Sequence, residues 1–247
     1  MPADVSQRPE PLVEVQPDAP ALATAVAGEL LNRLADAQTE GRVPQVVLTG
    51  GTIAARVHQE LARLSAGAGV DWTRVVVWWG DERFVAPDSE DRNARGAVAD
   101  LLGPVGATQV HQMPSTAEAA DVDAAAAAYA ETLREHGSDR FDVVMLGVGP
   151  DAHVASLFPG SASLEVTDRV ALGVSDSPKP PAERVSLSLD TLNRARSVWV
   201  VASGENKAAA VAASLATEGT VTDTPARGVR GEDETIWFLD TEAASLT

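Results

Sequence analysis

The chain has 247 residues, of which 45% are hydrophobic, and its 36 acidic and 19 basic side chains give a formal net charge of −17. This length allows one large α/β domain or two small ones, and the negative charge argues against nucleic acid or an anionic membrane as a partner. The sequence has no cysteine, no apolar stretch near the ~18 residues of a membrane span, and no signal-peptide pattern at residues 1–10, so we predict a cytoplasmic protein without disulfides or thiolate metal sites.

Apolar runs typical of strands alternate with helical patterns along the whole chain. In chain order, the patterns predict a strand at 12–15, a helix at 18–38, a strand at 46–49, a helix at 53–64, a strand at 74–79, a polar loop, helices at 93–102 and 117–136, strands at 141–146, 169–174, 184–189 and 197–202, a helix at 205–215 and a last strand at 235–239. Asp18 is placed to cap the first helix, and Gly137 to end the Ala-rich one.

Most of these strands are continuous apolar runs between helices, which is typical of a parallel sheet covered on both faces. We therefore predict an α/β fold, namely a three-layer, mostly parallel, Rossmann-like sheet with helices on both faces. Residues 11–247 are predicted to form a single domain, with room for a small subsidiary lobe near 161–190. Residues 1–10 are predicted to form a loose N-terminal tail.

Ligands of open parallel sheets bind outside the carboxyl ends of the strands, and the candidate motifs fall there. The first motif is Gly50-Gly51-Thr52, between a predicted strand and a predicted helix. Two glycines let the backbone curl around an anion, and the helix N-terminus presents free N–H groups to it. A tight turn that binds nothing explains this motif equally well.

The second motif is Asp81-Glu82-Arg83, which places three charges directly after the predicted strand at 74–79. Arg83 can clamp an oxyanion or a phosphate, and Asp81 can accept hydrogen bonds from hydroxyls or water. A structural ion pair at the end of the strand is the alternative.

The third motif is a glycine-rich turn at 147–153, which places Asp151 two residues before His153. A carboxylate beside an imidazole is suited to proton transfer, although a purely structural histidine is the alternative. Residues 147–152 also match the G-x-G-x-x-A dinucleotide fingerprint, but Pro159 stops the following helix within about two turns and three strand–helix units precede the pattern. Asp151 and His153 alone are too few ligands for a metal site.

Seventeen of the 19 basic residues are Arg, and the only lysines are Lys179 and Lys207. Such a bias favours keeping a lysine where a compact point charge is wanted, although two chance surface lysines are the alternative. Lys207 follows the strand at 197–202 and is predicted to lie near the mouth of the sheet. Arg184, after the Pro-rich loop at 177–181, is more ambiguous because many strands begin with a cation.

Together these motifs resemble the glucosamine-6-phosphate isomerase/6-phosphogluconolactonase family, and within it the 6-phosphogluconolactonases. The resemblance runs from about residue 12 to 243, and the segments that carry it are 49–52, 79–83 with Asn93, 147–160, 177–181 with Arg184, and 204–207. The ending Ala-Ser-Leu-Phe-Pro-Gly at 155–160 is the specific part, because deaminases typically continue with an Ala-Phe-Asn-Glu-Pro type of sequence. Two departures are Ala152, where the family usually has Gly, and Ile53-Ala54, where a proline commonly follows the glycine turn.

The resemblance implies a glucosamine-6-phosphate deaminase-like fold and hydrolysis of 6-phospho-D-glucono-1,5-lactone in the oxidative pentose phosphate pathway, without metal or organic cofactor and without an obligatory protein partner. It implies that His153 is the general base, that Asp151 orients His153 or a substrate hydroxyl, and that Arg83 stabilises the oxyanion or holds an anionic group. The residues implied to hold the phosphate and the sugar hydroxyls are Gly50, Gly51, Thr52, Arg184 and Lys207. A glucosamine-6-phosphate deaminase and a non-catalytic sugar-phosphate sensor remain alternatives.

Overall fold

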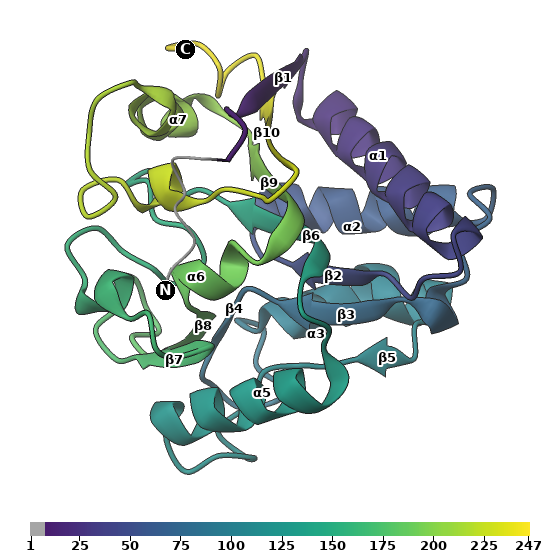
Figure 1. The fold of residues 1–247 in the computed structure, drawn as a ribbon, viewed down its shortest axis with the longest axis horizontal. Helices are drawn as coiled ribbons and strands as arrows, with labels where there is room; N and C mark the ends of the chain where they lie inside the picture. Colours follow the sequence, from purple (N-terminus) through teal and green to yellow (C-terminus); the bar gives the residue numbers. More distant parts are fainter. Residues whose placement is uncertain (1–7) are drawn as a thin grey trace.

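Seven parallel strands form the central sheet of the computed structural model, which describes residues 8–247 (Figure 1). Every neighbouring pair in this sheet is parallel, which confirms the predicted α/β class. The order across the sheet is β1 (Leu12–Gln16), β10 (Glu234–Asp240), β9 (Ala195–Ala202), β6 (Phe141–Gly147), β2 (Gln45–Leu48), β3 (Val76–Trp79) and β5 (Gln109–Val110).

The inner strands are buried because they are short apolar runs covered from both sides. Every residue of β2 and β3 is buried, and Trp78, Trp79 and Trp199 are fully inaccessible to solvent. Valines and large aromatic side chains fit such a doubly covered, pleated surface well. The core therefore lies directly on both faces of the strands whose ends form the site.

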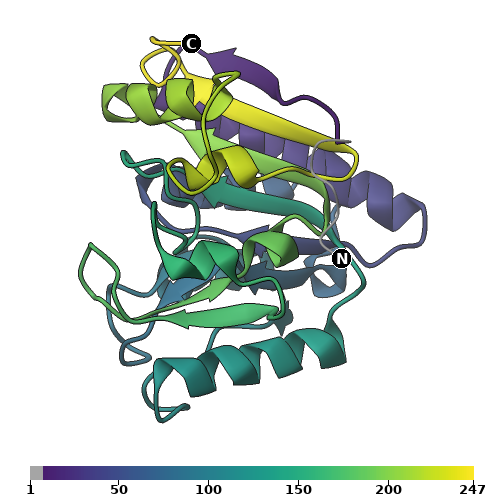
Figure 2. The same cartoon turned by 60° about the vertical axis from the view of Figure 1, so that its left-hand side comes forward.

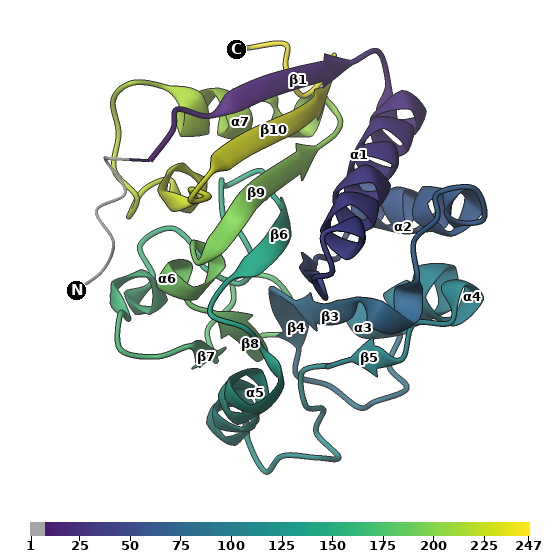
Figure 3. The same ribbon diagram turned by 45° about the vertical axis from the view of Figure 1, so that its right-hand side comes forward.

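Helices cover both faces of the sheet, and the chain changes face once. One face carries α1 (Ala19–Thr39), α2 (Thr52–Ser65), α3 (Asn93–Ala97) and α4 (Gly103–Val105), and the other carries α5 (Val122–His136), α6 (Leu189–Leu192) and α7 (Ala208–Leu215), as Figures 1 and 3 show. From β2 the chain moves to β3 and β5, toward one edge of the sheet. From β6 it moves to β9 and β10, toward the other edge. Because crossovers between parallel strands are right-handed, the two directions place their helices on opposite faces. The reversal falls between the adjacent strands β2 and β6.

A small antiparallel sheet lies beside α5 and consists of β4 (Asp81–Arg83), β8 (Arg184–Leu187) and β7 (Ala171–Val174), as Figure 2 shows. The prediction of a polar loop directly after β3 is therefore wrong at 81–83. These three residues are extended because they pair with residues 184–186 of β8, a partner about 100 positions away. The predicted strands near 169–174 and 184–189 exist, but they belong to this second sheet.

Three predicted helices differ from the observed ones. No helix follows the glycine turn after β6, because Ala152 and Ala155 have left-handed backbone angles that a continuous helix excludes. The Ala-rich helix begins at Val122 rather than at 117, because the Asp121 side chain caps it there by accepting from the Ala124 N–H. The helix predicted at 93–102 divides into α3 and a π-helix at Val98–Leu102.

The N-terminal residues are described from Arg8 onward, so residues 1–7 of the predicted tail lie outside the described residues. The Arg8 guanidinium donates to the main-chain oxygen of Asn193 at 2.6 Å. Within residues 8–247, no helix is both long and apolar enough to cross a membrane.

His58 on α2 is a buried titratable group inside this fold, only 3% exposed. Burial lowers its pKa to about 4, although the charge of Asp100 acts in the opposite direction. The unfolded chain, with a histidine pKa near 6.5, takes up a proton as the pH falls while the folded chain stays neutral. The free energy of unfolding should therefore decrease as the pH falls, by about 2 kcal/mol between pH 7.5 and pH 5.

We predict that His58→Leu removes this contribution to the pH dependence. Urea denaturation at pH 7.5 and pH 5 measures it, with His136→Gln as the control because the His136 side chain is 54% exposed. The same decrease in His58→Leu and in the unsubstituted chain would contradict the assignment.

Candidate active site

The site lies where β2 and β6 end side by side. From β2 the chain continues into α2 on one face, and from β6 it continues toward the other face, so the crevice between the two strand ends stays uncovered. The Gly147 N–H faces the Thr49 hydroxyl across this crevice at 3.4 Å. Residues that line the cleft there are Gly50, Gly51, Asp81, Arg83, Asn93, His153, Phe158, Lys179, Arg184 and Lys207.

His153 and Asp151 form a hydrogen-bonded pair at this cleft. Nδ1 of His153 lies 2.5 Å from Oδ1 of Asp151, and the His153 side chain is 18% exposed. With Nδ1 engaged, Nε2 is the ring nitrogen that can exchange a proton with a ligand. A histidine held in one tautomer by a carboxylate in this way is chemically able to act as a general base.

The surroundings of His153 favour its neutral form. Burial lowers the pKa of His153 and outweighs the hydrogen bond and charge of Asp151, which raise it. The Phe158 ring packs on the imidazole with a centroid separation of 4.6 Å. Burial also acts to raise the pKa of Asp151, but the hydrogen bond and charge of His153 and the charge of Lys179 bring it below its usual value. The pair therefore consists of a neutral imidazole and a carboxylate near pH 7.

The turn that presents this pair requires glycine at position 149. A Cβ there would lie 2.0 Å from Nδ1 of His153 and 2.3 Å from Oδ1 of Asp151. The turn is closed by the Gly149 N–H, which donates to the His153 main-chain oxygen at 2.9 Å. Ala152, which stands where the family usually has Gly, is buried inside this turn. It adopts φ +63°, the left-handed conformation that glycine prefers.

Asp81 and Asn93 link the charged strand β4 to the segments that follow β2 and β6. The Ser156 hydroxyl donates to Oδ2 of Asp81 at 2.7 Å, and both side chains are buried. Asn93 donates from Nδ2 to the main-chain oxygen of Asp81 at 3.1 Å and accepts from the Arg83 guanidinium. A Cβ at Gly50 would lie 1.9 Å from Oδ1 of Asn93, so the glycine turn after β2 closes tightly against this network.

Glu82 is a supporting residue rather than a ligand-facing one. Its side chain is 1% exposed and accepts three hydrogen bonds of 2.8 Å from the main-chain N–H groups of Arg83, Asn93 and Ala94. Burial raises the pKa of Glu82, and these N–H groups oppose that change. Glu82 thereby fixes the start of α3 against β4.

Arg83 and Arg184 oppose each other directly in the antiparallel pairing of β4 with β8. Burial lowers the pKa of Arg184, and the charge of Arg83 lowers it further. The Arg184 guanidinium donates to the main-chain oxygens of Pro181 (2.8 Å) and Lys179 (3.2 Å). Like charges directly opposite each other in a sheet are destabilising, so this pair is best accommodated when an anion lies between them.

Lys207 lies at the boundary between this cleft and a neighbouring hollow, which Thr52 and Arg56 also line. Its Nζ donates to the main-chain oxygen of Val148 at 2.8 Å. Burial lowers the pKa of Lys207, and the charge of Lys179 adds to this effect. Thr52 is the only predicted binding residue that lines the neighbouring hollow but not the cleft.

The sequence reasoning missed Lys179, Ser156 and Glu82 as parts of the site. Lys179 lies within 3.4 Å of both Asp151 and His153, so both lysines of the chain line one cleft. The rarity of lysine in the sequence is a signal that applies to Lys179 as much as to Lys207.

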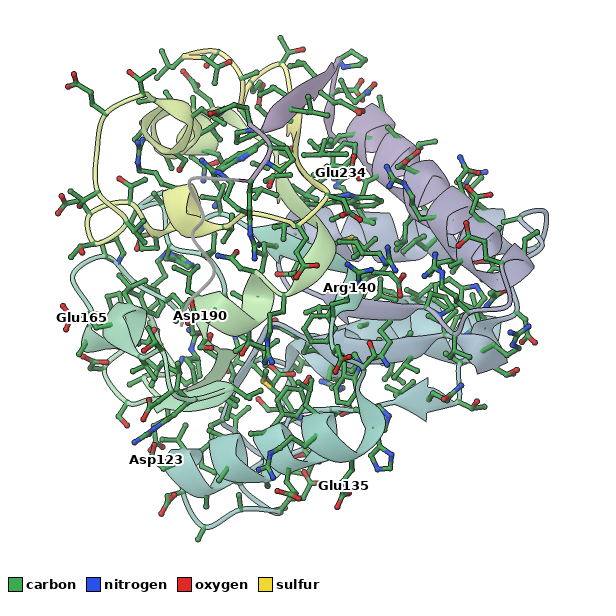
Figure 4. The ribbon with its side chains drawn as sticks, in the orientation of Figure 1. Asp123, Glu135, Arg140, Glu165, Asp190 and Glu234 are labelled. Atoms are coloured by element: carbon green, nitrogen blue, oxygen red, sulfur yellow. The ribbon has the colours of Figure 1, made fainter. Side chains whose placement is uncertain are left out.

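The charges of the molecule are distributed unevenly. Exposed acidic side chains such as Asp123, Glu135 and Glu165 lie on the outer elements (Figure 4), whereas four cations line the cleft. Among residues 8–247, no three or more histidine or acidic side chains cluster as metal ligands do. The arrangement can therefore bind an anionic ligand beside a histidine–carboxylate pair.

The family model described as glucosamine-6-phosphate isomerases/6-phosphogluconolactonase matches residues 17–237. The chain belongs to this family. A 6-phosphogluconolactonase from Streptomyces coelicolor is 42% identical over 246 residues, which cover 95% of this chain and 94% of that protein. The crystal structure of the Thermotoga maritima 6-phosphogluconolactonase has a TM-score of 0.82 and 26% identity, covering 94% of this chain and 100% of that one.

The family includes more than one activity on the same fold. A monomeric glucosamine-6-phosphate deaminase has a TM-score of 0.81 with this chain at 18% identity, covering 96% of this chain and 100% of its own. At that identity the likeness establishes the fold alone. The choice between the family's activities therefore depends on the residues of the cleft.

We predict that Glu82→Gln lowers the free energy of unfolding by about 2–3 kcal/mol, because an amide cannot accept all three N–H groups and places its own N–H₂ against one of them. Urea denaturation measures the change. Glu90→Gln is the matched control, since the Glu90 side chain is 93% exposed in the same loop. An unaltered denaturation midpoint in Glu82→Gln would show that Glu82 does not hold β4 to α3.

Proposed function

We propose that this chain hydrolyses 6-phospho-D-glucono-1,5-lactone to 6-phospho-D-gluconate, with His153 as the general base. The observation that carries the proposal is the pairing of His153 and Asp151 in a cleft that also contains four cations. A general base serves the addition of water to a lactone carbonyl, and the cations suit a phosphorylated substrate. The 42% identity to a protein named 6-phosphogluconolactonase over nearly its full length supports the same activity.

In the proposed reaction, Nε2 of His153 takes a proton from the water that adds to C1 of the lactone. Asp151 keeps the proton on Nδ1 and so leaves Nε2 free for this step. The lowered pKa of His153, caused mainly by burial, keeps the imidazole unprotonated near neutral pH. The base is thus present in its active form under ordinary conditions.

The carbonyl oxygen becomes an oxyanion when water adds, and Arg83 is the cation we assign to it. Asn93 accepts from the Arg83 guanidinium, which limits the positions this side chain can take. The C1–O5 bond then breaks, and the ring oxygen takes the proton that Nε2 of His153 had removed from water. The imidazole returns to its neutral form, and the new carboxyl group ionises in solution.

We assign the phosphate to Lys207, Arg184 and the turn Gly50-Gly51-Thr52, and the sugar hydroxyls to this turn and Asp81. Lys207 and Arg184 are partly desolvated cations that line the cleft, and an anion would restore the interactions they lose by burial. Gly51 is the N-cap of α2 and Thr52 is its first residue, so the free N–H groups of the first helical turn lie at this glycine turn.

The segment after His153 favours the lactonase reaction over deamination. Residues 154–160 contain no carboxylate, and the Phe158 ring packs against the imidazole instead. Ser156 is buried and hydrogen-bonded to Asp81, so this segment forms part of the cleft wall without adding a second acid or base. A non-catalytic sensor is disfavoured because Asp151 and His153 are both present and paired.

We place this activity in the cytoplasm, acting on a small phosphosugar lactone without a cofactor, nucleic acid or obligatory protein partner. The net charge of −17 supports the prediction on nucleic acid, because the phosphate backbone would be repelled. The single domain at 11–247 is part of the same proposal.

We predict that His153→Ala lowers the enzymatic rate by about 10²–10⁴-fold but leaves the background hydrolysis that the lactone undergoes in water. The measurement is the hydrolysis of freshly generated 6-phosphogluconolactone between pH 5.5 and pH 8, corrected for that background. In the unsubstituted chain, the rate should fall on the acidic side with a midpoint below 6.5, because the pKa of His153 is lowered by burial.

His136→Ala is the control for this experiment, because His136 is exposed at the end of α5. Full activity in His153→Ala would remove His153 from the mechanism. Release of ammonia from glucosamine 6-phosphate by the unsubstituted chain would replace the lactonase proposal with the deaminase.

A further inference from the structure

The ammonium group of Lys179 touches both members of the pair that carries the proposed chemistry. Its Nζ lies 3.4 Å from Oδ1 of Asp151 and 3.4 Å from Nδ1 of His153. Lys207, in contrast, directs its ammonium to the main-chain oxygen of Val148. The two lysines of the chain therefore have different surroundings in the same cleft.

We propose that Lys179 is a positioning residue for the lactonase reaction: its ammonium group holds the Asp151 carboxylate against Nδ1 of His153 and opposes a positive charge on the imidazole. This inference rests on the proposed function, and in it Lys179 acts through the pair. Its position on the Nδ1 side of the ring keeps it away from Nε2, the atom that exchanges the proton with water and the lactone.

Hydrogen-bond chemistry distinguishes the two contacts of Lys179. When Nδ1 of His153 donates its proton to Asp151, it has no lone pair to accept from an ammonium group. The contact between Lys179 and His153 is therefore a charge beside a ring, whereas the contact with Asp151 is a charged hydrogen bond. Oδ1 of Asp151 thus receives two donors, and its position is fixed from two sides.

The ammonium group of Lys179 opposes the effect of the Asp151 charge on the pKa of His153. Asp151 orients the imidazole, but its negative charge also raises the pKa of His153, and Asp81 from β4 acts in the same direction. Burial is the largest opposing effect, and the charge of Lys179 adds to it. The base can therefore be oriented by a carboxylate and still be neutral when water arrives.

The same charge acts on the second half of the proposed reaction. After Nε2 takes a proton from water, the imidazolium of His153 lies 3.4 Å from the Lys179 ammonium. This repulsion favours return of the proton to the ring oxygen as the C1–O5 bond breaks. No additional reactant is needed, because the proton that leaves His153 is the one it removed from water.

The main chain at Lys179 is held in place. The Ser177 hydroxyl and the Arg184 guanidinium both donate to its carbonyl oxygen, at 2.9 Å and 3.2 Å, and two prolines follow it. The side chain therefore projects from a fixed point of the cleft wall. A compact ammonium suits two acceptor positions that lie close together better than a planar guanidinium does, in a chain that otherwise uses Arg at 17 of 19 basic positions.

The test compares Lys179→Met and Lys179→Arg with the unsubstituted chain in the pH profiles of kcat and kcat/KM for 6-phosphogluconolactone. Lys179→Met should move the acidic limb up by about 0.5–1 pH unit, so that the rate at a pH well below the midpoint falls about 3–10-fold more than the rate at pH 8. Lys179→Arg keeps the charge and should keep the limb near its original position. Arg169→Met is the control, because it removes an exposed cation that precedes β7 and does not line the cleft; it should change neither pH profile.

A second measurement follows the imidazole itself by NMR titration, with His153→Ala identifying its resonance. The His153 midpoint should be higher in Lys179→Met than in the unsubstituted chain. Superimposable titrations would overturn the inference, and so would a raised KM with an unchanged acidic limb, which would place Lys179 against the substrate. Absence of lactonase activity in the unsubstituted chain would contradict the proposed function instead, while the titration would still decide whether Lys179 acts on His153.

Discussion

The parallel pairing of β2 with β6 is the constraint on which the site depends. Val46 pairs with Val143 and Val47 with Val144, and all four side chains are buried, so the two strands end side by side. Because the chain then leaves these strands toward opposite faces, the crevice between their ends remains an open cleft among residues 8–247. The two glycine turns that follow β2 and β6 line the cleft, and the candidate side chains lie around them.

The second constraint is the concentration of positive charge in a strongly acidic protein. Arg83 and Arg184 oppose each other across two short strands, and Lys179 and Lys207 lie in the same cleft. Such a cluster costs stability in the free protein, because each charge is partly desolvated and lies near another of the same sign. An anionic substrate would relieve that cost, which is why we propose that the cleft binds a phosphorylated ligand.

The sequence predicts those features that depend on neighbouring residues. The apolar runs of β2, β3 and β6, the Asp18 cap and the turn with Asp151 and His153 are all local patterns, and each is found close to its predicted position. The missed features are pairings between distant segments. β4 is a strand only because β8 pairs with it, Ser156 reaches Asp81 across 75 positions, and Lys179 meets His153 across 26 positions. A charged tripeptide or a lone lysine carries no local signal of such a partner.

The central claim is that two parts of the cleft act on one substrate. Lys207 and Arg184 bind its phosphate, and the His153–Asp151 pair activates water at its lactone carbonyl. The most direct measurement is the ratio of kcat/KM for 6-phosphogluconolactone to kcat/KM for unphosphorylated glucono-1,5-lactone, each corrected for spontaneous hydrolysis. Two charged contacts to phosphate should give a preference of about 10²-fold or more for the phosphorylated lactone. Equal values for the two lactones would contradict the account, because the cations would then have no phosphate to bind in the productive complex.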